Sequence, residues 1–337
     1  MPHHFIGDFK AGQKINQFFL IRKKERRRTR TGKDYLDLVL ADRTGTVGGK
    51  IWSEQITALE PLFAAGEFAG VAGRVESFQD ELQLTVERIK GVSRFTPDQL
   101  AAAPFDPDLL VPASPCDTVA LWSEMHVWAE QEIENPGLRS LTLGLLEKHR
   151  EAWLTWPAAK QYHHAYKGGL LEHSHRLVQL ARKVLEVFPD LDRSLVLAGA
   201  MLHDIGKIKE IDGFLTAQNS LEGQLIGHVA LGWEMVREAA RLISWEDPRT
   251  LLHLEHILLA HHGQLDFGSP VLPQTREALL IHTLDDLEGK LKMISGHLEQ
   301  DRGAEDFTDW NRILKRKFLK PKRGDQDPAC GAGGSLT

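Results

Sequence analysis

The sequence predicts a multidomain protein of α and β structure, in which a small N-terminal β-barrel precedes an all-α domain. Three observations lead to this prediction. Short β-prone runs fill residues 14–92, helical periodicity fills residues 118–319, and a proline-rich segment lies between the two. A chain of 337 residues is long enough for two or three domains of ordinary size. We therefore expect domains at 1–92 and 119–319, a linker at 93–118 and a tail at 320–337.

The N-terminal region has the pattern of five strands. Residues 15–21, 35–40, 47–52, 68–75 and 82–89 are short, apolar or alternating, and several are bounded by turn residues. Residues 55–63, between the third and fourth of these runs, have the pattern of a short helix. Five strands with one helix after the third is the order of an OB-fold barrel, and OB-folds bind oligonucleotides.

The connection between the first two predicted strands is strongly basic. Residues 22–33 contain eight Lys and Arg and one Glu. One interpretation is a solvated charge run; the other is a loop that follows the phosphates of a single strand, which is how OB-folds use this connection. The candidate phosphate contacts are Arg22, Lys23, Lys24, Arg26, Arg27, Arg28, Arg30 and Lys33.

Charge and aromatic residues add to the nucleic-acid interpretation. Residues 1–95 hold 16 Lys and Arg against 12 Asp and Glu, although the whole chain has a net charge of −6. A basic module joined to an acidic body suggests that the module meets a polyanion. Tyr35 and Trp52, with Phe18 and Phe19, are candidates for base stacking, and the alternative for each is a place in the barrel core.

Amino-acid composition predicts the structure of the two segments that border the helical body, at residues 93–118 and 320–337. Five prolines among Ala and Asp in residues 93–118 favour an extended linker. Residues 320–337 contain Pro and a run of Gly, which predicts a disordered tail. Between them, helical periodicity covers 170–188, 195–203, 227–243, 250–262 and 276–298, with no strand pattern, so this body is predicted to be all-α.

The candidate histidine and aspartate ligands lie in five separate helical segments of this body. The segments contribute His173, then His203 with Asp204, then His228, then His261 with His262, and finally Asp285. Successive groups are about 23 to 33 residues apart, which is one helix and one loop. Helix bundles build metal sites by pointing such side chains to a common centre.

The surroundings of these residues strengthen the metal interpretation. Residues 198–202 form an apolar run that leads directly into His203 and Asp204, and residues 257–260 lead in the same way into His261. Polar groups at such points are costly unless they are paired or bound to metal. The alternative is a set of hydrogen-bonded core histidines. With only two cysteines, a thiolate zinc finger is excluded, and nitrogen and oxygen ligands suit Mn, Fe, Co, Ni or Zn.

Residues 173–285 resemble the HD superfamily of metal-dependent phosphohydrolases, and more closely the YhaM-type 3′→5′ exoribonucleases. The matching stretches are 163–173, 202–207, 227–228, 261–263, 268–270 and 284–290. That family also carries an N-terminal OB-fold, so the resemblance covers about residues 10–319. One departure is Glu288-Gly289, where the family pattern has Asp-Ala; Asp285 is the position that matches a ligand.

The resemblance implies a ligand set and a reaction. His173, His203, Asp204 and Asp285 would hold one ion, and His228 and His261, with His262, a second, with Asp204 as the bridge. Mn²⁺ is the first expectation, with Co²⁺, Fe²⁺ or Ni²⁺ as others. The ions would activate a water for in-line attack on phosphorus. Asp204 and Lys207 are the candidate catalytic residues, and Lys207 would stabilise the phosphoryl oxygens; the alternative for Lys207 is a solvated helix end.

The expected activity is therefore 3′→5′ hydrolysis of single-stranded RNA, and also of single-stranded DNA, to nucleoside 5′-monophosphates. Two alternatives stand beside it: an HD phosphodiesterase or phosphatase that acts on small or cyclic nucleotides, and a non-catalytic protein that binds single strands. No apolar run approaches the length of a membrane span, and the N-terminus lacks a secretory pattern. We expect a cytoplasmic protein without a membrane partner, and the family suggests a ring-like homo-oligomer.

Overall fold

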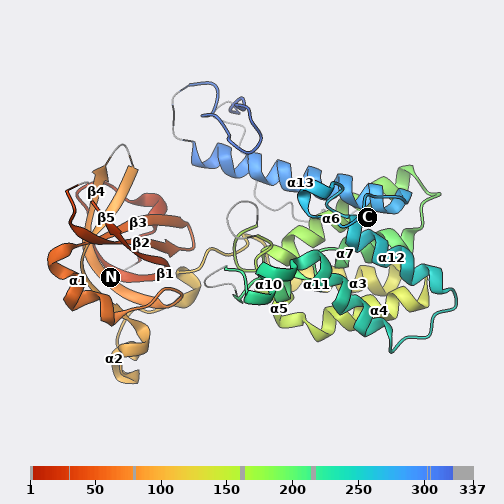
Figure 1. Ribbon diagram of the computed structural model, residues 1–337, viewed down its shortest axis with the longest axis horizontal. Coiled ribbons are helices and arrows are strands. Elements are labelled where there is room, and N and C mark those ends of the chain that lie inside the picture. The colour runs from red at the N-terminus through yellow and green to blue at the C-terminus, as the bar shows by residue number, and fades with distance from the viewer. Residues whose placement is uncertain are drawn as a thin grey trace, which may run out of the picture. The chain divides into compact units, whose positions relative to one another are not determined.

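The computed structural model describes residues 3–29, 31–78, 81–159, 164–213, 218–301, 303 and 305–321. The chain separates after Ala113 into an N-terminal unit of strands and a helical unit that begins at Ser114 (Figure 1). Within the described residues, none of the helices combines the length and the apolar character needed to cross a bilayer.

Five strands of the N-terminal unit form a closed barrel. They are β1 (Lys14–Arg28), β2 (Asp34–Asp42), β3 (Gly45–Trp52), β4 (Phe68–Phe78) and β5 (Glu81–Gly91), and α1 (Ser53–Leu59) lies between β3 and β4. The strand order around the barrel is β1-β2-β3-β5-β4, with β3 and β5 parallel and the other pairs antiparallel. This topology is the predicted OB-fold (Figure 1).

Alternation along β2 and β3 separates the barrel core from its outer face. Leu36, Leu38 and Leu40 are fully buried, and Ile51 on β3 joins them in the same core cluster. Because successive side chains of a strand point to opposite faces, the residues between them lie outside the barrel. Tyr35 and Trp52, which are cross-strand partners, therefore share the outer face.

The basic connection is not the loop that the sequence predicts. β1 continues to Arg28 and pairs with β2 in the register Glu25↔Asp37 and Arg27↔Tyr35. The connecting turn spans only residues 29–33, in which Arg30 lies outside the described residues. The sequence signal failed here because a ribbon with both faces in water needs no apolar alternation.

Residues 93–113 also differ from the predicted extended linker. The segment contains a short helix, α2 (Pro97–Ala101), and packs against the barrel. The ring centroid of Phe105 lies 5.1 Å from that of Phe18 and 5.5 Å from that of Phe68. Val111 is buried in a small cluster on the barrel surface. The boundary between the two units therefore falls at Ala113 rather than at residue 92.

The helical unit is all-α in its described residues, as predicted. Its helices are α3 (Thr118–Glu132), α4 (Pro136–Lys148), α5 (Arg150–Thr155), α6 (Gly169–Val187), α7 (Arg193–Leu202), α8 (Lys207–Glu210), α10 (Leu221–Ile226), α11 (His228–Ala240), α12 (Pro248–Ala260) and α13 (Arg276–Gln300). Every residue of α7 from Ser194 to Leu202 is buried. This helix contacts α3, α4, α6, α12 and α13, so the domain core surrounds it.

The chain after α13 is ordered as far as it is described. Isolated antiparallel bridges pair Phe307 with Leu319 and Asn311 with Arg316. Residues 322–337, which make up most of the predicted disordered tail, lie outside the described residues.

Candidate metal centre

The structure brings all seven candidate ligands to one region of the helical unit. His173 lies in the second turn of α6, and His203 and Asp204 follow the buried helix α7. His228 is the first residue of α11, and the pair of histidines at 261 and 262 follows α12. Asp285 lies in the middle of α13. The seven side chains are therefore positioned by five different packed helices or helix ends.

The first group of ligands centres on His173. Its Nε2 atom lies 3.1 Å from His203 Nε2, 3.1 Å from Asp285 Oδ1 and 3.4 Å from Asp204 Oδ2. His173, His203 and Asp204 are buried, and their ligand atoms lie close enough together to hold one ion. These atoms converge from α6, from α13 and from the turn that follows α7, which is how helix bundles build metal sites.

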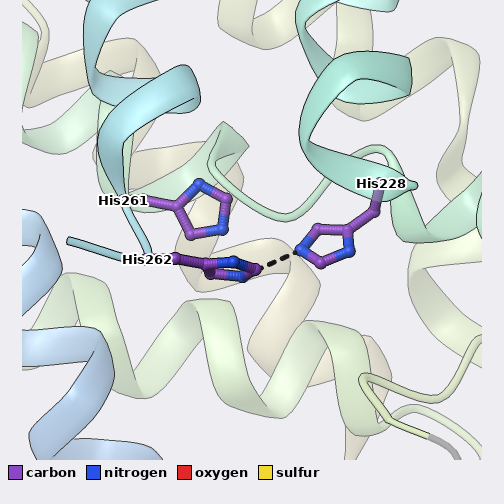
Figure 2. Close-up of side chains that lie close together, drawn as sticks. All are labelled: His228, His261 and His262. Carbon is purple, nitrogen blue, oxygen red and sulfur yellow. Dashed lines mark hydrogen bonds between the residues drawn. The ribbon is translucent and has the colours of Figure 1, made fainter. Parts of the chain in front are cut away.

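The second group is formed by His228, His261 and His262, whose ligand atoms lie within 4.8 Å of one another. Figure 2 shows the rings of His228 and His262 directed toward each other, with 3.1 Å between their Nε2 atoms, and His261 beside them. His261 Nε2 is buried and has no hydrogen-bond partner in the part of the chain that the structure describes. Such an atom is costly to bury unless a ligand satisfies it, so it fits a metal-binding role.

Asp204 lies between the two groups and presents one carboxylate oxygen to each. Its Oδ2 atom lies 3.4 Å from His173 Nε2 and 3.3 Å from His203 Nε2. Its Oδ1 atom lies 3.5 Å from His228 Nε2 and 3.7 Å from His261 Nε2. This is the arrangement that a carboxylate bridging two ions needs.

Backbone carbonyl groups orient three of the histidines. Nδ1 of His203 donates to the oxygen of Ala200 at 3.0 Å, and Nδ1 of His261 to that of Leu258 at 2.7 Å. Nδ1 of His262 donates to the oxygen of Phe267 at 2.7 Å. Because a neutral imidazole carries one proton, these bonds leave Nε2 with a free lone pair directed at the centre.

A close backbone contact places the second group beside the first. A Cβ atom on Gly206 would lie 1.9 Å from the carbonyl oxygen of His228, so only glycine allows the start of α11 to approach this turn. Gly206 follows Asp204 by two residues. The turn therefore fixes the distance between the carboxylate and the imidazole of His228.

The carboxylates of the first group favour positive charge on His173. Burial opposes charge on His173, but hydrogen bonds to Asp285 and Glu288 outweigh it and raise the pKa of His173 to about 10. Burial also opposes charge on Asp204, yet Lys207 and His203 hold its pKa well below the usual range. Burial lowers the pKa of His261 well below the usual value. A field that retains a proton on His173 also favours a divalent cation, which displaces that proton on binding.

Two acidic residues that sequence reasoning did not select also belong to the centre. Glu288 Oε2 lies 2.8 Å from His173 Nδ1, and Glu210 Oε1 lies 3.2 Å from His228 Nδ1. Glu288 stands one helical turn after Asp285, and this spacing indicates that the two side chains share a face of α13. Lys207 contacts Asp204 Oδ2, so its ammonium group reaches the centre.

On the outer face of the barrel, the half-buried Tyr35 forms an aromatic pair with the exposed Trp52. Their ring centroids lie 5.7 Å apart, and Trp52 is 38% exposed. Lys50 Nζ lies 5.2 Å from the centroid of the Tyr35 ring. Phe18 and Phe19 are buried in the barrel unit, so they are core residues and not stacking platforms.

Four basic residues at the end of β1, and Lys33 in the turn that follows, are paired with carboxylates. The ion pairs are Lys23–Glu25 at 2.8 Å, Arg26–Asp34 at 3.3 Å, Arg27–Glu25 at 2.9 Å, Arg27–Asp37 at 3.1 Å, Arg28–Asp34 at 2.9 Å and Lys33–Glu54 at 3.9 Å. Lys24 differs, because its ammonium donates to the carbonyl oxygens of Glu60 and Phe63 at 2.6 and 2.8 Å. Arg22 is half-buried. The ribbon is therefore less positive than its sequence suggests.

A barrel of OB-fold order followed by a helical unit with this cluster of His and Asp defines an HD-domain protein. The model of the HD domain family matches residues 170–290. The protein named 3′-5′ exoribonuclease YhaM of Bacillus subtilis (strain 168) is 30% identical over 315 residues, which are 92% of this chain and 96% of that protein. The protein of the same name from Oceanobacillus iheyensis is 31% identical over 314 residues, 92% of this chain and 95% of that protein.

The chain therefore belongs to the YhaM family. Among solved structures, a domain of replication protein A from Methanococcus maripaludis matches with 21% sequence identity and a TM-score of 0.23, covering 26% of this chain and 93% of that domain. The second OB-fold domain of replication protein A from the same organism matches with 21% identity and a TM-score of 0.22, covering 28% of this chain and 97% of that domain.

Proposed function

We propose that the protein is a metal-dependent 3′→5′ exoribonuclease that releases nucleoside 5′-monophosphates from single-stranded RNA, and that it also accepts single-stranded DNA. The observation that carries the proposal is the position of Asp204, whose two oxygens face two separate groups of histidines. The names of the relatives support the polarity and the RNA substrate. We also propose a cytoplasmic homo-oligomer, on the family resemblance.

The donor set fits two divalent ions. His173, His203, Asp204 and Asp285 would hold the first, and His228, His261 and His262 would hold the second, with Asp204 shared. Imidazole and carboxylate ligands of this number suit Mn²⁺, and Co²⁺, Fe²⁺ or Ni²⁺ as substitutes. When bound, such ions lower the pKa of a water molecule and polarise phosphoryl oxygens.

The side chains of the protein itself supply orientation and charge. Lys207 lies one helical turn after His203 and its ammonium reaches Asp204, so it can donate to a non-bridging oxygen of the scissile phosphate. The low pKa of Asp204 keeps this carboxylate ionised over the whole physiological range. The leaving group is the 3′-oxygen of the preceding nucleotide.

The barrel would hold the strand from which nucleotides are removed. Tyr35 and Trp52 offer ring faces on which bases can stack, and stacking accepts any sequence. The basic residues proposed to follow the phosphates are Arg22, Lys23, Lys24, Arg26, Arg27, Arg28, Arg30 and Lys33. Of these, Lys24 is the weakest candidate, since two backbone carbonyls already bind its ammonium.

Cleavage of end-labelled RNA tests reaction class and polarity together. With Mn²⁺, a 5′-labelled oligoribonucleotide should give a ladder that shortens gradually, whereas a 3′-labelled one should release a labelled mononucleotide at once. Cyclic dinucleotides and mononucleotides are assayed in parallel. Hydrolysis of these small nucleotides alone would support an HD phosphodiesterase instead, and RNA binding without any hydrolysis would support a non-catalytic binding protein.

A further inference from the structure

Two of the proposed histidine ligands are supported by a carboxylate rather than by a backbone carbonyl. They are His173, which contacts Glu288, and His228, which contacts Glu210. The two histidines belong to different ligand groups. Each half of the centre therefore contains one imidazole whose second nitrogen faces a negative charge.

Glu288 is held rigidly between two buried imidazoles. Its Oε2 atom lies 2.8 Å from His173 Nδ1, and its Oε1 atom lies 2.8 Å from His164 Nε2. His164 in turn contacts the hydroxyl of Tyr166 at 2.9 Å, and that hydroxyl donates to Glu172 at 2.8 Å. With both oxygens engaged, Glu288 cannot rotate away from His173 without breaking a second buried hydrogen bond.

Glu210 holds His228 by two atoms at once. Its Oε1 atom accepts from the backbone N–H of His228 at 3.1 Å and faces Nδ1 of the same residue at 3.2 Å. Glu210 is the last residue of α8, and His228 is the first of α11. The carboxylate therefore satisfies a free N–H at the start of α11 and fixes the imidazole in the same contact.

We propose that Glu288 and Glu210 are positioning residues, each of which holds one histidine with its Nε2 atom directed at one half of the metal centre. Neither residue is a ligand in this proposal, which rests on the proposed two-ion function. His164, His173 and Glu288 lie close enough together to form an ion site of their own. However, the 2.8 Å spacings are those of hydrogen bonds, and Nε2 of His173 is directed at Asp204 and Asp285 instead.

A carboxylate on the second nitrogen has two effects on a metal-binding histidine. It fixes the proton on Nδ1, so that Nε2 carries the lone pair, and it makes the imidazole a stronger donor. Loss of such a partner typically weakens metal binding by about 10–100-fold. Glu288→Ala should therefore lower the affinity for the first ion by this factor, and Glu210→Ala should lower the affinity for the second.

The chain offers a matched control on the same helix. His175 lies two residues after His173 in α6, is buried, and contacts Glu124 Oε2 at 2.8 Å. This pair also joins a buried imidazole to a carboxylate, although Glu124 is exposed, and it takes no part in the centre. Glu124→Ala should leave the affinity of both ions unchanged.

The experiment is a titration with Mn²⁺ alone, in which free ion is counted by electron paramagnetic resonance. The parent should bind two ions. In an Asp285→Ala background, which removes the first ion, Glu288→Ala should leave the remaining affinity unchanged, whereas Glu210→Ala should lower it by about 10–100-fold. Thermal unfolding of each metal-free variant checks folding, and Glu288→Gln, which keeps the volume and loses the charge, replaces the alanine variant if that one does not fold.

The outcomes separate this inference from the function on which it rests. A parent that binds two ions, with variants at Glu288 and Glu210 that bind them equally well, would overturn the positioning role and leave the centre intact. An equal loss in Glu124→Ala would also overturn it, since the effect would then be structural. A parent that binds no Mn²⁺ would overturn the metal centre and the inference together.

Discussion

Lys207 contacts Oδ2 of Asp204, which is the same oxygen that faces His173 and His203. In the metal-free protein the ammonium therefore supplies part of the positive charge that an ion would bring. If an ion were bound at Oδ2 of Asp204, the Lys207 ammonium would have to share that oxygen with the ion or move away from it. A long, flexible side chain that is released in this way can reach the substrate phosphate.

Lys207→Met should lower the rate of RNA cleavage by about 10²–10³-fold, because a charged donor to the phosphoryl oxygens is lost. Binding of Mn²⁺ should be retained or strengthened, since a competing cation is removed from Asp204. Single-turnover cleavage and Mn²⁺ titration measure the two effects. Lys209→Met is the control, because Lys209 lies on the same short helix and pairs with Glu234 at 3.1 Å. Unchanged cleavage by Lys207→Met would remove this residue from the chemistry.

Asp204→Asn should abolish Mn²⁺-dependent cleavage, because a neutral amide has only one oxygen and cannot bridge two ions as a carboxylate would. RNA binding should remain, and it should remain sensitive to salt, since the barrel is untouched. Cleavage assays and fluorescence anisotropy with a labelled single strand test the two parts. A variant that cleaves as fast as the parent would show that the bridging assignment is wrong.

Two Mn²⁺ ions should raise the thermal stability of the helical unit. An ion at 100 times its dissociation constant adds about 2.7 kcal/mol to the free energy of unfolding. Differential scanning calorimetry with and without EDTA measures the shift in Tm, and Asp204→Asn should show a smaller one. The metal-free protein should stay folded, because its core of buried Leu, Ile and Val does not include the ligands. Equal Tm values with Mn²⁺ and with EDTA would contradict occupation of the centre.

Arg26, Arg27 and Arg28 should contribute less to RNA affinity than three unpaired arginines. Replacing all three by Ala should reduce the slope of log K against log salt concentration by less than about 2. Loss of three full phosphate contacts would reduce this slope by about 2. The carboxylates that pair with them suggest the opposite change: Asp34→Asn with Asp37→Asn should strengthen binding and steepen the salt dependence. Affinity measured from low to high salt tests both, and weaker binding by the Asn variant would contradict the proposed role of the ribbon.

Trp52→Ala and Tyr35→Ala should each weaken strand binding by roughly 1–3 kcal/mol, the usual value of one stacked base. Unlike the arginine variants, they should leave the salt dependence unchanged, because stacking releases no counterions. Phe78→Ala, at another exposed aromatic position of the barrel, serves as the control. A change in salt slope without a change in affinity would argue against stacking.

Sequence reasoning located the helices and the candidate ligands because both leave local signals. The helix predicted at residues 170–188 is Gly169–Val187, and the one predicted at 276–298 is Arg276–Gln300. Apolar periodicity carries this information, and polar groups at the ends of apolar runs mark the ligands. His173 and Asp285 come from different helices but meet at 3.1 Å.

The errors fall where the structure depends on contacts between distant residues. The long ribbon of β1 has polar residues on both faces, so its sequence gave no alternation to follow. Phe105 became part of the barrel unit by packing against Phe18 and Phe68, which lie far from it in the sequence. Glu288 departs from the family pattern; its spacing from Asp285 indicates a shared helix face, but its contact with His173 depends on how α13 packs against α6.

The burial of α7 determines at which stage His203 and Asp204 reach their positions in the centre. The residues from Ser194 to Leu202 are buried, so packing against the surrounding helices places His203 and Asp204 before any metal ion binds. The entropy of ordering these ligands is therefore lost during folding rather than during ion binding. The fold around α7 should therefore stay the same when one metal replaces another or when no ion is bound.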